Sequence, residues 1–237
     1  MNPLTSKKVL VVGGSSGIGA ATAKAFAELG ADVLIASRSE AKLAATATGI
    51  GKSVRTAVLD TTDADAVESF FAKAGGFDHV VISAAQTAGG PIRKLALADA
   101  YAAMDSKFWG AYRVARAAQI ADGGSLTLVS GFLSVRPSKT SVLQGAINAA
   151  LEALARGLAL ELSPVRVNTV SPGLIATPLW SKLDEDARQS MYEGAAARLP
   201  ARRVGQPEDV ANAVVYLAST PFATGSTVLV DGGGAIV

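Results

Sequence analysis

The stretch Lys8-Val-Leu-Val-Val-Gly-Gly-Ser-Ser-Gly-Ile-Gly19 decides the fold class of this protein. Its first five residues predict a short buried strand, Lys8–Val12, and the pattern that follows predicts a helix over Gly17–Leu29. Glycines let the chain turn tightly and let backbone N–H groups approach a pyrophosphate, while the helix N-terminus adds a favourable dipole. The turn is therefore a candidate dinucleotide site, formed by Gly13, Ser15, Ser16, Gly17, Ile18 and Gly19.

The glycines of this turn follow the spacing G-x-x-x-G-x-G rather than the G-x-G-x-x-G of many dinucleotide sites. Glycine-rich turns between a strand and a helix also arise where close packing alone requires them, so the spacing by itself leaves both interpretations open. The position of the turn, after the first strand of a β-α-β unit, favours cofactor binding.

Short β-branched runs alternate with longer alanine-rich runs along the rest of the chain. Such alternation is typical of β-α-β units, and right-handed crossovers then predict a doubly wound sheet. We expect one α/β domain over residues 1–237, a Rossmann fold with a seven-stranded parallel sheet and helices on both faces. The other predicted strands are Asp32–Ser37, Ser53–Asp60, His79–Ser83, Ser125–Ser130, Val165–Val170 and Thr227–Val230. The other predicted helices are Asp63–Ala74, Asp99–Ala121, Ser141–Ser163 and Pro207–Ala218.

Composition and charge exclude several classes of function. The 22 basic and 20 acidic residues give a net charge of +2 without a long basic run, so we expect no nucleic-acid partner. The chain has no cysteine and one histidine, His79, so we expect no metal site. It shows neither a signal-peptide pattern nor the roughly 20 apolar residues of a membrane span, which predicts a cytoplasmic protein without a membrane partner.

The predicted helices Ser141–Ser163 and Asp99–Ala121 carry apolar residues on nearly every side. A helix of this kind must be covered all round, and the sheet covers only one of its faces. We expect the other face to pack on a second subunit, in a homodimer or a homotetramer. The alternative is that the long segment after Ser171 covers these helices.

The sequence resembles the short-chain dehydrogenase/reductase family almost from end to end. The turn Gly13–Gly19 is similar to the cofactor turn of that family, and Arg203-Val-Gly-Gln-Pro-Glu-Asp209 and Val230-Asp-Gly-Gly233 are similar to its C-terminal signatures. The resemblance implies a nicotinamide cofactor and a set of contacts to it. These are an adenine contact at Asp60 and Thr61, a ribose-lining pair at Ala84 and Ala85, and a nicotinamide segment, Ser171–Thr177, with Pro172, Gly173, the Ile175 backbone and the Thr177 hydroxyl.

The end of the second predicted strand distinguishes NADP(H) from NAD(H). A site for NAD(H) usually places a carboxylate there to bind the ribose hydroxyls, whereas a 2′-phosphate needs a cation. The chain has Ser37-Arg38-Ser39 at this point, and its next carboxylate is Glu40. Arginine pairs bidentately with phosphate and stacks on adenine, so we expect a preference for NADP(H). The alternative is that Arg38 is a solvated surface residue.

The side chains that carry the reaction in the family have no counterpart at the matching positions. The resemblance implies a Tyr-x-x-x-Lys pair between Ser130 and Glu161, in which the lysine lowers the pKa of the phenol, together with a serine and an asparagine. Aligning on Glu161 and on Asn168 places Gln144 at the tyrosine position and Asn148 at the lysine position. The family's serine falls on Gly131, and Ser130 precedes it by one residue, which points its side chain to the other face of a strand.

Lys107 stands where the resemblance implies the family's asparagine. We hypothesise that Lys107 reaches into the space left by the missing lysine, bonds Asn148 or the ribose, and stabilises charge or donates a proton. A desolvated lysine has a pKa low enough for such work. The alternative is a lysine that lies along an interface helix with its ammonium in water. The candidate catalytic residues are thus Lys107, Ser130, Gln144 and Asn148.

The segment Leu174–Gly205 is long and contains apolar residues among charges, which indicates a loop that closes over a mostly apolar substrate or anchors on the core. Three functions remain open. The first is an NADP(H)-dependent oxidoreductase that acts on a carbonyl or alcohol. The second is a non-catalytic NADP(H)-binding sensor or partner subunit, and the third is a non-redox reaction with a structural cofactor.

Overall fold

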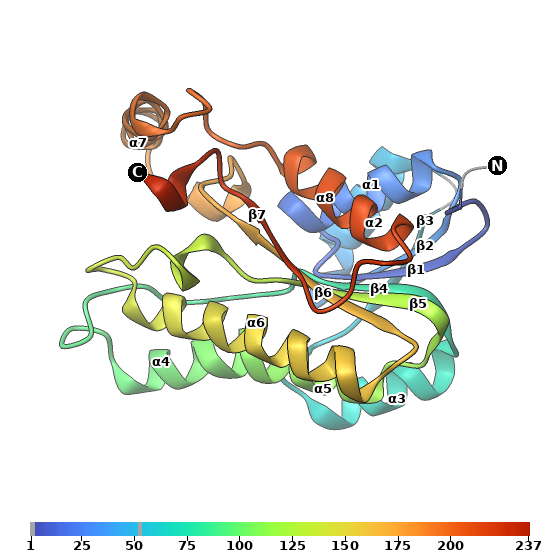
Figure 1. Ribbon diagram of the computed structural model, residues 1–237. Helices are drawn as coiled ribbons and strands as arrows, with labels where there is room; N and C mark the ends of the chain where they lie inside the picture. Colours follow the sequence, from blue (N-terminus) through green and yellow to red (C-terminus); the bar gives the residue numbers. More distant parts are fainter. Residues whose placement is uncertain (1–2, 52–53) are drawn as a thin grey trace.

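The computed structural model describes residues 3–51 and 54–237. Within these residues, seven strands form one sheet in the order β3-β2-β1-β4-β5-β6-β7, and every neighbouring pair is parallel. In Figure 1, α1, α2 and α8 lie on one face of the sheet, and α3, α4, α5 and α6 lie on the other. The predicted doubly wound Rossmann fold is confirmed.

The bounds of the elements follow the alternation that the sequence predicts. The strands are β1 Lys8–Val12, β2 Asp32–Ser37, β3 Val54–Val58, β4 Phe77–Ile82, β5 Ile120–Val129, β6 Arg166–Pro172 and β7 Thr227–Val230. The α-helices are α1 Gly17–Glu28, α2 Glu40–Ile50, α3 Ala64–Ala74, α4 Leu97–Met104, α5 Gly110–Ala117, α6 Val142–Glu161, α7 Glu185–Arg198 and α8 Pro207–Ser219.

Two cores flank the sheet because successive strand residues point to opposite faces. In β1, Leu10 and Val12 pack toward α3, α5 and α6, whereas Val9 and Val11 pack toward α1 and α8. The central strands are apolar on both faces for this reason, which is why they read in the sequence as continuous apolar runs. Helices cover both faces of the sheet, so a ligand site is expected at an end of the strands.

Two helices were not among the sequence predictions. Helix α2 begins after Ser39, whose hydroxyl accepts a hydrogen bond from the Lys42 amide at 3.4 Å. Helix α7 interrupts the segment predicted as a long loop, and it begins after Asp184, whose carboxylate accepts from the Ala187 amide at 2.8 Å. Both caps are visible in the sequence. Neither helix has a strong apolar stripe, so periodicity alone did not indicate them.

The predicted helix Asp99–Ala121 is wrong as one continuous helix. Helix α4 passes into a π-helical turn, Asp105–Trp109, closed by a hydrogen bond from the Gly110 amide to the Asp105 carbonyl, and α5 then ends at Ala117. The last predicted helical residues belong to β5, because Ile120 pairs with Phe77 ahead of a register shift in the sheet. β4 and β5 therefore begin earlier than predicted.

Smaller differences lie at the ends of strands and helices. The predicted strand Ser53–Asp60 begins on Ser53, which lies outside the described residues, and β3 ends at Val58. Helices fray and pass into turns at their ends, so shifts of one or two residues carry no functional meaning. In the described part of the chain, no helix combines the length and the apolar character that crossing a membrane requires.

Candidate active site

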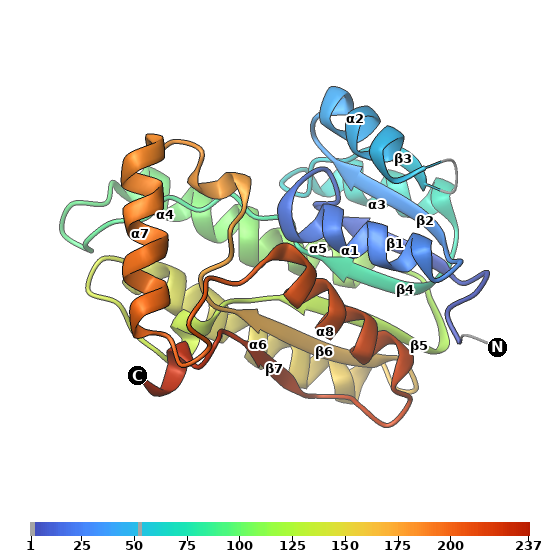
Figure 2. The ribbon, with the colours of Figure 1, turned by 90° about the horizontal axis from the view of Figure 1, so that it is seen from above.

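The candidate residues gather at the carboxyl ends of the parallel strands. The segments that follow β4, β5 and β6 all extend toward the same end of the molecule, on the left in Figures 1 and 2, where α7 also lies. The carboxyl ends of parallel strands are where open α/β sheets bind ligands. The long sequence separations between the candidate residues are therefore bridged by topology rather than by local structure.

The glycine-rich turn leaves the start of α1 open. Ser16 precedes the helix without a side-chain hydrogen bond to it, and the first turn of α1 has no acidic residue. Gly13 has a φ of +89° and Gly17 a φ of +51°, values that favour glycine. A Cβ atom on Gly13 would lie 2.5 Å from the backbone nitrogen of Ala84, so this position has no room for a side chain. The turn offers backbone amides and a helix dipole to an anion.

The remaining residues of the turn hold it against its neighbours. The Ser15 carbonyl accepts a hydrogen bond from the Thr46 hydroxyl on α2 at 3.0 Å. Ile18 packs on the core between the sheet and α1, and Gly19 is buried under Ser83 and the Gly13 backbone. These contacts fix the turn from behind while Ser16 stays exposed.

The segment predicted to contact the nicotinamide lies beside this turn. A Cβ atom on Gly17 would lie 3.3 Å from Cγ2 of Thr177, which places the two segments in contact range. Gly173 donates its amide to the Val230 carbonyl at 3.0 Å directly after Pro172 ends β6. Ile175 is buried, and its carbonyl accepts a hydrogen bond from the Trp180 indole at 2.9 Å. The backbone around Ile175 is thus held rigidly at the site.

The residues predicted to contact adenine differ in accessibility. The Asp60 carboxylate accepts hydrogen bonds from the amide and the hydroxyl of Thr62, at 2.9 and 2.8 Å. The hydrogen bond from the Thr62 backbone amide lowers the pKa of Asp60, and partial burial opposes this shift. The Asp60 carboxylate is therefore anionic near neutral pH. Thr61 is buried against Gly110, and its carbonyl accepts from Arg113 at 3.2 Å. The Thr61 side chain is therefore a packing residue here.

Arg38 lies at an open pocket of about 370 Å³ between the ends of β2 and β4 and helix α4. Its guanidinium donates to Oε1 of Gln86 at 2.7 Å, and the backbone amide of Gln86 donates to the Ser106 hydroxyl at 2.9 Å. The neighbouring Ser37 hydroxyl is buried without a hydrogen-bond partner among the described residues. The Ala84 backbone amide donates a hydrogen bond to the Val12 carbonyl, and Ala85 is exposed. Arg38 thus presents a cation at this pocket, whereas the Ser37 hydroxyl is enclosed.

Lys107 and Asn148 meet although they lie 41 residues apart. The Lys107 ammonium donates to Oδ1 of Asn148 at 2.6 Å and to the carbonyl of Ser130 at 2.7 Å. The predicted bond between Lys107 and Asn148 is therefore present. Lys107 projects from the π-helical turn, a widened helical turn that is common at functional sites. The interpretation of Lys107 as a lysine with its ammonium in water is wrong.

Burial lowers the pKa of Lys107 from its usual value of 10.5 to about 8, and the negative charge of Glu152 opposes this shift. A fraction of the lysine is then neutral at mildly alkaline pH, whereas an exposed lysine stays fully charged. The group can hold and release a proton in the range where enzymes work.

Gln144 and Ser130 make structural contacts. Gln144 donates its amide nitrogen to the Ala88 carbonyl, which ties α6 to the segment after β4. The Ser130 hydroxyl, buried as the predicted one-residue offset requires, donates to Oε1 of Glu152 at 2.9 Å. A Cβ atom on Gly131 would lie 2.7 Å from Nδ2 of Asn148, so a serine at position 131 would collide with that amide. Among the candidate catalytic residues, Lys107 and Asn148 are the two whose side chains are hydrogen-bonded to each other.

Glu152 is a residue of this site that the sequence analysis did not single out. It is one helical turn beyond Asn148 on α6 and is buried, with 7% of its surface exposed. A carboxylate within a mostly apolar stretch, four residues after the candidate Asn148, is the signal that could have indicated it. Burial of a carboxylate is costly unless it is paired or hydrogen-bonded, so such a residue needs an explanation.

The comparisons with known proteins cover almost the whole chain. A family model described as enoyl-(acyl carrier protein) reductase matches residues 12–234. An uncharacterized oxidoreductase of Mycobacterium tuberculosis is 34% identical, over 97% of this chain and 92% of its own length. A 3-oxoacyl-(acyl-carrier-protein) reductase of Thermotoga maritima is 32% identical, over 97% of this chain and 98% of its own length.

Solved structures agree with the sequence matches. A short-chain dehydrogenase/reductase family protein superposes with a TM-score of 0.90 at 36% identity, covering 100% of both chains. A small-chain dehydrogenase in complex with NADPH superposes with a TM-score of 0.83 at 34% identity, covering 98% of this chain and 100% of the other. The chain belongs to the short-chain dehydrogenase/reductase family and is an oxidoreductase of that type.

Proposed function

We propose that residues 1–237 form one dinucleotide-binding domain that transfers hydride between NADP(H) and a carbonyl or alcohol substrate, with Lys107 as the group that exchanges the proton. The observation that carries this proposal is the hydrogen-bonded Lys107–Asn148 pair at the carboxyl end of the sheet. The lysine and the amide have exchanged the positions that the family resemblance implies for them. The site would thereby keep an ammonium next to the reaction centre after losing the usual tyrosine and lysine.

Two features support the fit of the cofactor to this chain. The turn Gly13–Gly19 has no room for a Cβ atom at Gly13 and presents an open helix start to the pyrophosphate. The Arg38 guanidinium lies at the open pocket after β2, where it would supply the cation that a ribose 2′-phosphate requires. We assign Asp60, Ala84, Ala85 and the segment Pro172–Thr177 to the remaining contacts. The bound nicotinamide supplies or accepts the hydride.

Lys107 has the donors that the proton transfer needs. An ammonium carries three N–H donors. Two of them donate to Oδ1 of Asn148 and to the Ser130 carbonyl. The third is then free for the oxygen of the substrate or the ribose hydroxyl next to it. In the reducing direction Lys107 would donate its proton to the carbonyl oxygen as the hydride arrives. A group with a pKa of about 8 is suited to this exchange near neutral pH.

Replacement of Arg38 tests the preference for NADP(H). We expect Arg38→Gln to weaken NADPH binding by about 10-fold, because charge-assisted hydrogen bonds to a phosphate contribute about 1.5–3 kcal/mol and an exposed site gives the lower value. NADH affinity should change little, since NADH has no 2′-phosphate. Isothermal titration with both cofactors measures this difference, and Arg136→Gln, at an exposed arginine elsewhere, is the control. Equal losses for the two cofactors would contradict the assignment.

Exposed apolar side chains support the proposed substrate class and assembly. Leu179 and Leu183 are exposed between β6 and α7, in the segment that borders the site, and they favour an apolar carbonyl or alcohol.

Tyr101 is 71% exposed on α4, and Leu160 is 84% exposed on α6, so the segment after Ser171 does not cover these side chains. We propose that a second subunit covers them, in a homodimer or homotetramer.

Cofactor titration followed by a turnover assay on the same sample tests the proposed function. We expect NADPH to bind more tightly than NADH and its absorbance to fall when apolar aldehydes or ketones are added. Tight binding with no consumption of NADPH across the panel would favour a cofactor sensor or a partner subunit. Failure to bind either cofactor would overturn the proposal at its base.

A further inference from the structure

The carboxylate of Glu152 is held by hydroxyl groups from three separate segments. Its Oε1 atom accepts hydrogen bonds from Ser134 at 2.7 Å, from Ser130 at 2.9 Å and from Ser171 at 3.2 Å. Ser130 follows β5, Ser134 lies in a short 3-10 turn, Phe132–Ser134, and Ser171 lies in β6. Three neutral donors lower the cost of burying the charge and fix the position of the carboxylate.

Ser130 links this carboxylate to the proposed proton donor. The Ser130 carbonyl accepts from the Lys107 ammonium at 2.7 Å, and the hydroxyl of the same residue donates to Glu152. Asn148, the other acceptor for Lys107, is four residues before Glu152 and shares its face of α6. The Lys107 ammonium and the Glu152 carboxylate therefore bond to two groups of the same residue, the carbonyl and the hydroxyl of Ser130.

The two charges interact electrostatically as well as through Ser130. Glu152 favours the charged form of Lys107, whereas burial disfavours it. Among the described residues, Glu152 is the charged group that acts on Lys107 in this way. The serines make the carboxylate a fixed charge at a set place, because any movement of it would break hydrogen bonds to two strand ends and one turn.

We propose that Glu152 is a positioning residue that acts through Lys107: its fixed carboxylate is the counter-charge that keeps the Lys107 ammonium protonated and seated between Ser130 and Asn148. Glu152 transfers no proton itself. The catalytic consequence rests on the proposed function of Lys107, whereas the coupling between the two charges does not. A glutamate that only ties α6 to the strands would affect stability and leave the titration of Lys107 unchanged.

The titration of Lys107 in the full-length protein, followed by NMR with lysine labelled with carbon-13 at Cε, tests this coupling without any substrate. Loss of one signal in Lys107→Met assigns the resonance. We expect Lys107 to titrate near pH 8 in the wild type and at clearly lower pH in Glu152→Gln, because the neutral amide no longer stabilises the ammonium. Glu161→Gln is the matched control. It makes the same substitution on the same helix at an exposed position, and it should leave the titration of Lys107 in place.

The activity profile gives a second readout. The rate of carbonyl reduction should begin to fall at lower pH in Glu152→Gln than in the wild type, with Glu161→Gln unchanged. An unchanged Lys107 titration in folded Glu152→Gln overturns the proposal even if its activity falls. A shifted titration without turnover in any variant supports the coupling and overturns the proposed function of Lys107 instead.

Glu152→Asp keeps the proposal testable if Glu152→Gln does not fold. The aspartate retains the charge on a side chain one methylene shorter, which moves the carboxylate away from Ser130. We expect the Lys107 titration to shift in the same direction as in Glu152→Gln and by less. A folded Glu152→Asp with a wild-type Lys107 titration would overturn the proposal.

Discussion

Lys107→Met should lower kcat/KM for carbonyl reduction by at least about 100-fold, the lower end of the range for loss of a general acid. Methionine has nearly the length of lysine and fills the same space, but it cannot donate to Asn148 or Ser130. We expect cofactor affinity to change much less than kcat/KM, because the contacts assigned to the pyrophosphate and the 2′-phosphate lie elsewhere and at most one donor to the ribose is lost. Steady-state kinetics together with NADPH titration separate these two effects.

The pH dependence of the wild-type rates tests the same mechanism, because the direction of each change can be predicted. Lys107 donates a proton during reduction only when it is charged, and burial lowers its pKa to about 8. The rate of reduction should therefore fall as pH rises through about 8, and the rate of alcohol oxidation should rise over the same range. Lys139→Met, at an exposed lysine before α6, is the control and should keep the wild-type profile. Wild-type activity in Lys107→Met would exclude this residue as the proton donor.

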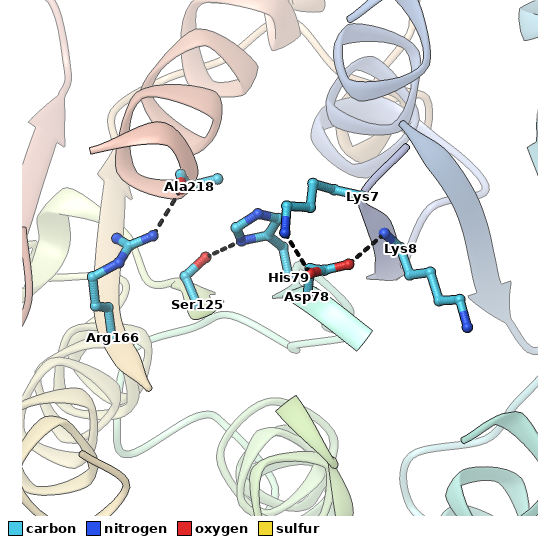
Figure 3. Close-up of polar contacts among 7 residues, drawn as sticks. All are labelled: Lys7, Lys8, Asp78, His79, Ser125, Arg166 and Ala218. Atoms are coloured by element: carbon cyan, nitrogen blue, oxygen red, sulfur yellow. Dashed lines mark hydrogen bonds and ion pairs between the residues drawn. The ribbon is translucent and has the colours of Figure 1, made fainter. Parts of the chain in front are cut away.

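His79 should make this protein sensitive to acid, and Figure 3 shows the polar contacts around it. The imidazole is 5% exposed in β4, where Nδ1 lies 2.9 Å from the Ser125 hydroxyl and the ring stacks near Phe26. Burial lowers the pKa of His79 from 6.5 to about 4. The Asp78 charge opposes this shift, and the Arg166 and Lys7 charges add to it.

The unfolded chain therefore binds a proton before the folded protein does as the pH falls. Stability that is present above about pH 6.5 should be lost progressively down to about pH 4. A pKa difference of this size corresponds to about 3 kcal/mol in the free energy of unfolding. Denaturant unfolding at several pH values between 7.5 and 4.5 measures the loss.

His79→Asn should remove most of this pH dependence, although the variant itself is less stable because it loses the ring. The chain has no other histidine. The Arg203 hydrogen bond lowers the pKa of Asp209 to about 2, so the contribution of Asp209 is lost only below about pH 4. Ser125→Ala keeps the imidazole and should keep the slope. A slope in His79→Asn equal to that of the wild type would show that another group titrates in this window.

Local patterns were enough to determine the architecture. Apolar runs of strand length, helical periodicity and a glycine-rich turn are all encoded in short stretches of consecutive residues, so they predicted seven strands that each overlap a strand of the sheet. The helices without an apolar stripe, α2 and α7, needed attention to their caps at Ser39 and Asp184 instead. The π-helical turn at Lys107 had no local signal, because a helix with one wide turn keeps nearly the same composition.

By itself the sequence determined the sheet, the glycine turn, the Arg38 cation and the absence of a Tyr-x-x-x-Lys pair between Ser130 and Glu161. The pairing of Lys107 with Asn148 could be predicted because family spacing placed both residues at one site. Only the tertiary structure revealed the contacts between Glu152 and the serines that hold it. Those serines come from segments up to 41 residues apart, and they meet because parallel strands bring their carboxyl ends to one edge of the sheet. Contacts of that range depend on topology, which no local pattern of residues contains.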